Sequence, residues 1–221
     1  MRKKAVALFA TLVFPVAMGF AQDGHFDFSL HAAAVFTKQS TGNGITQKAT
    51  DGGGGFGTFR VRFNPKHSII FNYGRDKNSQ IYQSIANFHI LNTVSEYSFG
   101  YMFTPFQKGR FEPFLLAGVG ALSFYPNSTW VFFPLAPGNI PNNVQINLNA
   151  AKQTQLAYLY GLGVDYRIPR FERFAVRLQY RGILYKEPDF KIDANSGSAI
   201  SFFTGARGHM AEPSVGLVFR F

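Results

Sequence analysis

Residues 174–181 read FAVRLQYR, and this stretch decides how the chain folds. Every second residue from Phe174 onward is apolar, whereas Arg177, Gln179 and Arg181 occupy positions between them. Successive side chains of a β-strand point to opposite faces, so a period of two predicts a strand with one apolar and one polar face. The stretch therefore predicts a sheet whose two faces meet different surroundings.

The same period of two recurs along the chain, and no helical stripe accompanies it. Eight segments carry the alternation, and they are rich in the aromatic and β-branched residues that strands favour. They lie at about residues 25–38, 55–63, 67–74, 93–103, 111–125, 155–167 and 174–185, and in a last segment that ends at Phe221. The predicted fold class is therefore all-β.

The connections between these segments alternate in length. The links at 64–66, 104–110 and 169–173 are short, and those at about 39–54, 75–92, 126–154 and 186–212 are long. Short turns on one side and long loops on the other are typical of outer-membrane barrels. We therefore expect an eight-stranded antiparallel up-and-down transmembrane β-barrel with short periplasmic turns and long extracellular loops.

The volume of the side chains indicates which face lies inside. Eight strands enclose room only for side chains or one small ligand, and the aromatic rings of the apolar face would overfill that space. Each arginine that faced lipid near the midplane would cost about 2–4 kcal/mol. Turning Arg177 and Arg181 outward would thus cost about 4–8 kcal/mol, which rivals the net stability of a domain. The polar face is expected to line the lumen.

The segment at 111–125 is apolar on both faces, so its parity is the least defined. We expect Leu115, Ala117 and Val119 to face outward and Gly118 and Gly120 to face inward.

Charges in a closed lumen require partners, because an unpaired buried charge is costly. We expect one network of ion pairs and hydrogen bonds that fills and stiffens the barrel rather than transporting a solute. Its predicted members are Arg60, Arg62, Arg167, Arg177, Arg181 and Arg220 with Asp27, Glu96, Asp165 and Glu212.

The N-terminus carries the pattern of an export signal. Basic residues 2–4 precede an apolar run at 5–20, and small residues at Gly19 and Ala21 suit a signal peptidase. The alternative, an uncleaved membrane helix, is disfavoured because the run is short of about 20 residues and Pro15 interrupts it. We predict a signal peptide at 1–21 and a barrel domain at 22–221. Removing the signal lowers the formal charge from +10 by its three cations.

The last nine residues, PSVGLVFRF, alternate apolar side chains at Val215, Leu217, Phe219 and Phe221. This segment resembles the closing strand of bacterial outer-membrane proteins, and the resemblance implies a signal read by the barrel assembly machinery. The whole chain after Ala21 is similar to the small eight-stranded outer-membrane, or porin-like, β-barrel family. The similarity is one of pattern and layout. It implies a location in the outer membrane and says little about activity.

Metal and catalytic sites find weak support. His25 and His31 share a strand face, but six residues of strand separate them by about 20 Å, too far for one ion. Relatives of the lipid A deacylase kind carry a serine, a histidine and an acid on a late strand, and Ser201, His209 and Glu212 lie close in sequence here. No His-x-Ser pair appears. We predict no catalytic site, metal or cofactor, with a lipid-modifying enzyme as an alternative.

The glycine run at 52–55 lacks the Gly-Lys-Ser/Thr of a phosphate loop and is interpreted as flexible. The basic residues are dispersed, so nucleic acid is not an expected partner. Lipopolysaccharide phosphates are the expected contact for Lys38, Lys186, Lys191 and Arg207, with ordinary solvated loop charges as the alternative. The expected partners of a monomeric barrel are outer-membrane lipid and lipopolysaccharide, and the assembly machinery during biogenesis.

The link at 126–154 contains an apolar cluster at 128–135. It predicts either a contact surface or an extension of the fifth and sixth strands that packs the cluster between them. The second reading is favoured because Val144, Ile146 and Leu148 share parity with Leu156. Ten strands would result if 130–148 formed its own membrane hairpin. The predicted function is a structural or surface-interaction role without an open wide pore, with a narrow channel or small-solute carrier as the first alternative.

Overall fold

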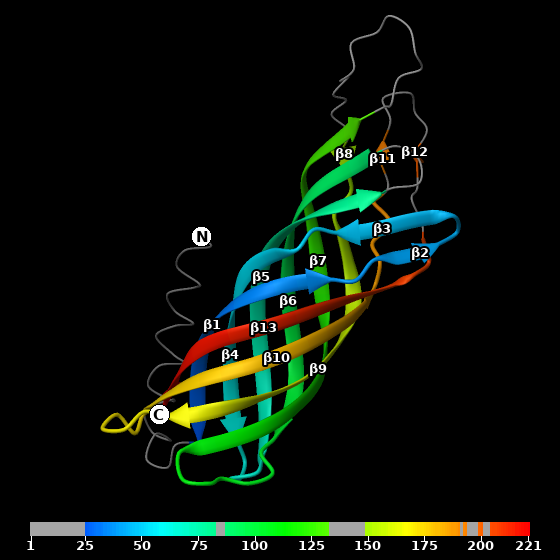
Figure 1. Cartoon of the computed structure of the whole chain (residues 1–221). Helices are drawn as coiled ribbons and strands as arrows, with labels where there is room; N and C mark the ends of the chain where they lie inside the picture. The colour runs from blue at the N-terminus through cyan, green and yellow to red at the C-terminus, as the bar shows by residue number, and fades with distance from the viewer. Residues whose placement is uncertain (1–24, 83–86, 133–148, 191, 194–198, 201–203) are drawn as a thin grey trace, which may run out of the picture.

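The fold is an antiparallel barrel of eight long strands (Figure 1). A computed structural model describes residues 25–82, 87–132, 149–190, 192–193, 199–200 and 204–221. The long strands are β1 (Phe26–Thr37), β4 (Gly52–Arg62), β5 (His67–Tyr82), β6 (Asn87–Phe103), β7 (Phe111–Phe132), β9 (Gln153–Arg167), β10 (Phe174–Lys186) and β13 (Arg207–Arg220). The predicted signal peptide at 1–21 lies outside the described residues.

The sheet closes on itself. Strands β5, β4, β1, β13, β10, β9, β7 and β6 pair in that order, and β6 pairs with β5 again. The first and last strands meet along nearly their whole length, from Asp27 opposite Arg220 to Thr37 opposite Met210. The amide of Phe26 also donates to the carbonyl of Phe221 at 3.3 Å. The predicted eight-stranded antiparallel barrel is confirmed.

The short turns all lie at one end of the barrel, together with the C-terminus and the start of β1 (Figure 1). We call this the turn end and the opposite one the loop end. At the loop end β2 (Ser40–Gly42) and β3 (Ile45–Ala49) form a hairpin whose turn residues Asn43 and Gly44 have φ of 49° and 73°. An Asn-Gly pair suits this turn because both positions require a positive φ. Strands β8 (Asn149–Ala150), β11 (Ile192–Asp193) and β12 (Ala199–Ile200) form a small separate sheet.

Two strands extend much further than the sequence predicted. The expected long link at 75–92 is instead the outer part of β5 and β6, which stay paired up to Tyr82 opposite Phe88. This segment is polar on both faces for several residues, so it carries no clear period of two. The link between these strands shrinks to 83–86.

The apolar cluster at 128–135 agrees in part with the favoured interpretation, because the fifth strand of the barrel, β7, extends through its described part. Its described part, 128–132, extends β7 and pairs with the outer end of β6, where Phe132 lies opposite Asn87. The sixth strand starts at Gln153, and residues 133–148 lie outside the described residues, so the packing of the cluster between the two strands stays a prediction. Val144, Ile146 and Leu148 lie outside the described residues. The closed barrel itself contains eight long strands and not ten.

The glycine run at 52–55 is a strand rather than a flexible loop. It begins β4 and pairs with β1 on one side, Gly52 opposite Val35. On the other side β5 lies so close that a Cβ on Gly54 would come within 2.6 Å of the Cβ of Asp76. The glycine thus permits a close approach of two strands.

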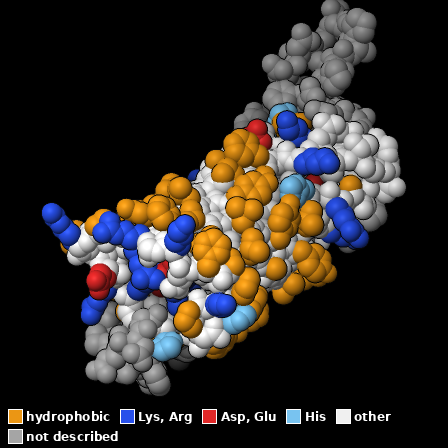
Figure 2. All heavy atoms as spheres, turned by 60° about the horizontal axis from the view of Figure 1, so that its bottom comes forward, with side chains coloured by type: hydrophobic (Ala, Val, Ile, Leu, Met, Phe, Trp, Pro, Cys, Tyr) orange, Lys and Arg blue, Asp and Glu red, His pale blue; other side chains and the backbone are white. Residues whose placement is uncertain are grey.

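The two faces of the barrel wall differ as the period of two predicted. Leu30, Leu178 and Leu217 are 61%, 55% and 62% exposed on the outside, whereas Asp27 and Arg177 are fully buried inside. On β7 the parity is also the expected one, with Leu115 and Val119 outward. Figure 2 shows apolar side chains around the middle of the visible face and Lys and Arg toward both ends. Among the described residues, no helix has the length and apolar character needed to cross a membrane.

Candidate functional site

The lumen is filled by three successive layers of side chains. The first, at the turn end, consists of eight charged residues that we call the turn-end ion-pair layer. Its members are Asp27, Arg60, Arg62, Glu112, Asp165, Arg167, Arg177 and Arg220. Five guanidinium groups share three carboxylates, and they come from six of the eight strands. The layer therefore ties opposite walls of the barrel together.

Asp165 lies at the centre of this layer. Its carboxylate accepts hydrogen bonds from Arg177 Nε at 2.6 Å and Nη2 at 2.9 Å, and from Arg60 Nη2 at 3.1 Å. Arg220 Nη2 adds a fourth at 3.4 Å. Arg177 and Asp165 are both fully buried. Charge-assisted bonds of this fork geometry are among the stronger hydrogen bonds in proteins.

Asp27 supports the same guanidinium groups from β1. It accepts from Arg60 Nε at 2.5 Å and from Arg62 Nε at 3.3 Å, and one of its oxygens lies 3.8 Å from Arg177 Nη2. The ring of Phe114 also lies 5.0 Å from the Arg177 guanidinium carbon. Each buried charge in this part of the layer thus has a charged partner, as its burial requires.

Glu112 is a member that the sequence reasoning missed. It accepts from Arg220 at 2.7 and 3.0 Å, from Arg167 Nε at 2.6 Å and from Arg62 Nη2 at 3.4 Å. The sequence did indicate that Glu112 faces the lumen, because it shares the inward parity of Gly118 and Gly120. The apolar character of both faces of β7 concealed it.

The second layer is a smaller cluster in the middle of the barrel, which we call the middle ion-pair layer. Arg181 donates to Glu96 at 2.8 Å and, through Nε, to Glu212 at 3.0 Å. Its guanidinium carbon lies 3.6 Å from the ring centre of Phe56, and the other face of that ring stacks on His31 at 4.3 Å. The ten predicted network residues thus divide between two layers rather than forming one.

Little space remains around the middle layer. The free volume of the pocket among Glu96, Arg181, Glu212 and their neighbours is about 10 Å³. That is about the volume that one water molecule needs.

The third layer, toward the loop end, is apolar and was not predicted. We call it the loop-end apolar layer. Its members, all at most 4% exposed, are Val35, Tyr82, Ile90, Val94, Leu122, Phe124, Leu159, Ile183, Tyr185, Phe190 and Met210. Many of them lie on parts of the chain that the sequence assigned to loops or to a strand of uncertain parity. Charged pairs thus dominate the turn end and middle of the lumen, whereas apolar side chains gather at the loop end beside uncharged polar residues such as Gln80 and Asn92.

The segment at 187–190, which follows β10, packs against the interior of the barrel at the loop end. Phe190 is fully buried and its ring meets Phe124 edge-on at 6.2 Å. The hydroxyl of Tyr82 donates to the carbonyl of Pro188 at 3.3 Å, and the amide of Asp189 donates to the side chain of Gln153 at 2.8 Å. We call this segment the plug. It is held by both backbone and side-chain bonds.

Glu187 begins the plug and is nearly buried. Ser40 Oγ donates to its carboxylate at 3.1 Å, and the Glu187 amide donates to the carbonyl of Ala206 at 3.1 Å. Burial raises the pKa of Glu187 to about 7, with the Ser40 bond opposing that change. The carboxyl is thus partly protonated near neutral pH, which lowers the cost of keeping it buried.

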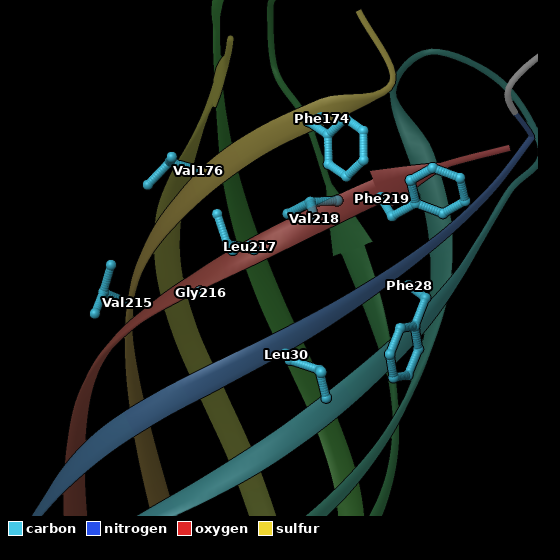
Figure 3. Close-up of a pocket in the computed structure, with 9 residues that line it drawn as sticks. All are labelled: Phe28, Leu30, Phe174, Val176, Val215, Gly216, Leu217, Val218 and Phe219. Carbon is cyan, nitrogen blue, oxygen red and sulfur yellow. The ribbon is translucent and has the colours of Figure 1, made fainter. Parts of the chain in front are cut away.

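The residues of the predicted assembly signal lie on the outer wall. Val215, Leu217 and Phe219 are 50%, 62% and 38% exposed, and Phe221 stacks on Phe219 at 5.8 Å. Val215, Leu217 and Phe219, together with residues of β1 and β10, line an apolar groove of about 560 Å³ across the seam where the barrel closes (Figure 3). A groove without polar lining on an exposed wall suits a hydrocarbon environment.

The residues considered for catalysis do not come together. His209 lies on the outer wall, where its Nε2 is 2.8 Å from the hydroxyl of Tyr160. Glu212 points into the lumen and binds Arg181. Three residues along a strand place side chains on opposite faces, so this pair cannot share a substrate. Ser201 lies outside the described residues, and within the described part of the chain no cluster of potential metal ligands is found.

Solved structures of small outer-membrane barrels share this fold. Neisserial surface protein A is 14% identical with a TM-score of 0.53, over 89% of this chain and 97% of that one. The outer membrane protein OprG from Pseudomonas aeruginosa is 12% identical with a TM-score of 0.56, over 88% and 95%. A major outer membrane protein from Thermus thermophilus is 14% identical with a TM-score of 0.56, over 89% and 99%. At these identities the similarity shows the fold alone.

No protein-family description matches the chain, and no curated protein matches it. The class that fold and lumen define is thus a small closed β-barrel of the outer-membrane architecture with a filled interior.

Proposed function

We propose that the chain is an integral outer-membrane protein with a structural or surface-interaction role and without an open pore. The outward apolar belt supports the membrane placement, because exposed Leu30, Leu178 and Leu217 would be unfavourable in water. A closed sheet also satisfies the backbone groups that hydrocarbon cannot hydrogen-bond. The relatives in fold, which are outer-membrane proteins, support the same placement.

The placement also fixes an orientation. In outer-membrane barrels the short turns face the periplasm and the long loops face outward. The signal peptide would direct export and be cleaved after Ala21, and the closing strand with Val215, Leu217, Phe219 and Phe221 would be presented to the barrel assembly machinery. We propose both steps from the sequence pattern.

The absence of a pore is supported by one observation, the filling of the described lumen by buried side chains at three levels. The turn-end layer, the middle layer and the loop-end apolar layer follow one another along the barrel axis, and the plug covers the last. An ion would have to displace paired guanidinium groups at one end and buried rings at the other. Either step removes interactions that the fold depends on.

We predict that the folded barrel shows no steady conductance steps in planar lipid bilayers. The physical reason is the filled lumen, in which the space beside Arg181 holds about one water. The measurement is single-channel recording after insertion, with a pore-forming peptide added afterwards to prove that the same membrane reports a pore. Reproducible steps that scale with the amount of folded protein and vanish with heat-denatured protein would favour the narrow channel or solute carrier instead.

We propose no enzymatic activity. A lipid-modifying enzyme of the deacylase kind would need a serine, a histidine and an acid side by side. Here His209 lies on the outer wall and Glu212 in the lumen, so these two side chains cannot act together. Replacing His209 by asparagine is then not expected to change lipid acylation in cells that express the protein.

A further inference from the structure

A second groove lies on the outer wall at the loop end, and we call it the rim groove. It has a volume of about 570 Å³ and lies where the end of β1 meets β9, β10 and β13. Exposed Lys38 and Arg207 mark its edge toward the loops. Tyr160 and Leu184, which are 43% and 41% exposed, mark its edge toward the middle of the barrel. The rim groove is therefore cationic on the side toward the loops and apolar on the side toward the middle of the barrel.

The apolar side of the rim groove is held in place by specific contacts. The Tyr160 ring is parallel to the His209 ring, with 6.1 Å between their centres, and their polar atoms are 2.8 Å apart. The Tyr160 ring lies across Gly182, where an added Cβ would come within 2.3 Å of it. Only glycine lets the ring lie flat against the wall, so the surface is shaped before any ligand arrives.

Residues of β10 and β13, and the residue that follows β1, form the cationic side of the rim groove. The amide of Lys38 donates to the carbonyl of His209 at 3.0 Å, which places the end of β1 beside β13. Arg207 lies opposite Lys186 in the pairing of β13 with β10. Two carboxylates lie near this rim: Glu187, which is buried and bound by Ser40, and Asp51, which accepts from the amide of Thr37 at 3.3 Å. Neither lines the rim groove, whose charged lining residues are Lys38 and Arg207. The outer face of this rim thus presents positive charge.

We propose that the rim groove binds lipid A, the phosphorylated glycolipid anchor of lipopolysaccharide. A phosphate would contact Lys38 and Arg207, because an arginine fork and a lysine point charge suit phosphate oxygens. An acyl chain would lie along Tyr160 and Leu184. This inference rests on the proposed outer-membrane placement, which puts the loop end in the outer leaflet.

The structure adds a defined location to the lipopolysaccharide contact that the sequence predicted. The sequence predicts that Lys38, Lys186 and Arg207 meet lipopolysaccharide phosphates from the outer loops, and the fold places all three at one rim. Lys191 lies outside the described residues. His209 and Tyr160, which complete the groove, were not predicted, because their pairing joins β13 to β9 across β10.

Binding of defined lipids to the folded full-length barrel tests the proposal. Native mass spectrometry of the protein in detergent would compare bisphosphorylated lipid A, the same lipid without phosphates, and phosphatidylglycerol. We expect bisphosphorylated lipid A to bind at least about tenfold more tightly than the other two, the scale of one charge-assisted phosphate contact. The double variant K38Q/R207Q should lose that preference. The matched control K66Q/K108Q, which removes two exposed lysines from the turn end, should keep it.

Each other outcome has a defined meaning. Equal binding of the phosphorylated and dephosphorylated lipid by the native barrel, or equal binding of phosphatidylglycerol, would overturn the site. Retention of the preference in K38Q/R207Q would overturn it as well, provided that heat-modifiable migration in gels shows the variant folded. Failure of the native protein to insert into lipid vesicles would instead contradict the proposed function, so the two failures are distinguishable.

Discussion

The variant Asp165→Asn is expected to lower the free energy of unfolding by about 3–5 kcal/mol, the range measured when one partner of a buried ion pair is removed. Arg177 depends on Asp165 for both of its close carboxylate bonds, at 2.6 and 2.9 Å. Its remaining carboxylate partner, Asp27, lies 3.8 Å away. The substitution would leave five guanidinium groups of the turn-end layer with two carboxylates.

Urea unfolding in lipid vesicles measures this effect, with Glu172→Gln as the matched control. Glu172 is exposed on the turn between β9 and β10. Its replacement should change the stability by no more than about 0.5 kcal/mol, as is usual for surface positions. The double variant Asp165→Leu with Arg177→Met should lose less than Asp165→Asn alone, because it removes the guanidinium that depends most on Asp165. Arg60 keeps Asp27 as a partner, and Arg220 keeps Glu112. A stability of Asp165→Asn within about 1 kcal/mol of the native protein would contradict the role given to this layer.

The variant Leu178→Arg is expected to cost about 2–4 kcal/mol, the range measured for arginine at the midplane of barrel proteins. Leu178 is 55% exposed and lies midway along the outward row of β10, opposite Val215 of β13. The neighbouring residue, Arg177, faces the lumen instead, where Asp165 pairs with its charge. The two positions differ only in the face of the wall that they occupy.

A second outward residue of β10, placed nearer to the membrane surface than Leu178, provides the control. Phe174 is an outward residue at the turn end of β10, where it packs against Phe219 at 5.2 Å. An arginine there lies near the interface and should cost only about 0–1 kcal/mol for its charge. Unfolding of both variants in the same vesicles compares the two depths. Equal losses at Leu178 and Phe174, or no loss at Leu178, would contradict a membrane-facing wall.

The sequence predicted the barrel because its central strands carry a clean period of two. In 174–181 the arginines fix the parity, since an outward arginine is costly. The short turns follow from the gaps between these strands. The ion-pair partners within the lumen could not be predicted from the sequence, because a period of two shows which face a residue occupies and not how deep it lies along the barrel axis. Arg177 and Arg181 therefore looked like members of one network, whereas four residues of strand place them in separate layers.

The loop end could not be predicted for a different reason. The outer part of β5 has polar residues on both faces, so alternation is lost where the strand leaves the apolar belt. The plug residues Glu187 and Phe190 belong to no periodic segment, and only the fold shows that Phe190 enters the barrel. Gly54 has no side chain to contribute to a pattern, although the close approach of Asp76 requires it.

The central claim is that the apolar rings face hydrocarbon while the charges face the lumen, and oxygen accessibility along β10 tests it most directly. The chain contains no cysteine, so single cysteines at 174–181 can each carry a spin label without a background signal. In lipid vesicles, the accessibility to dissolved oxygen should alternate with a period of two and peak at positions 174, 176, 178 and 180. Peaks at 175, 177, 179 and 181, or no alternation along the strand, would contradict the account.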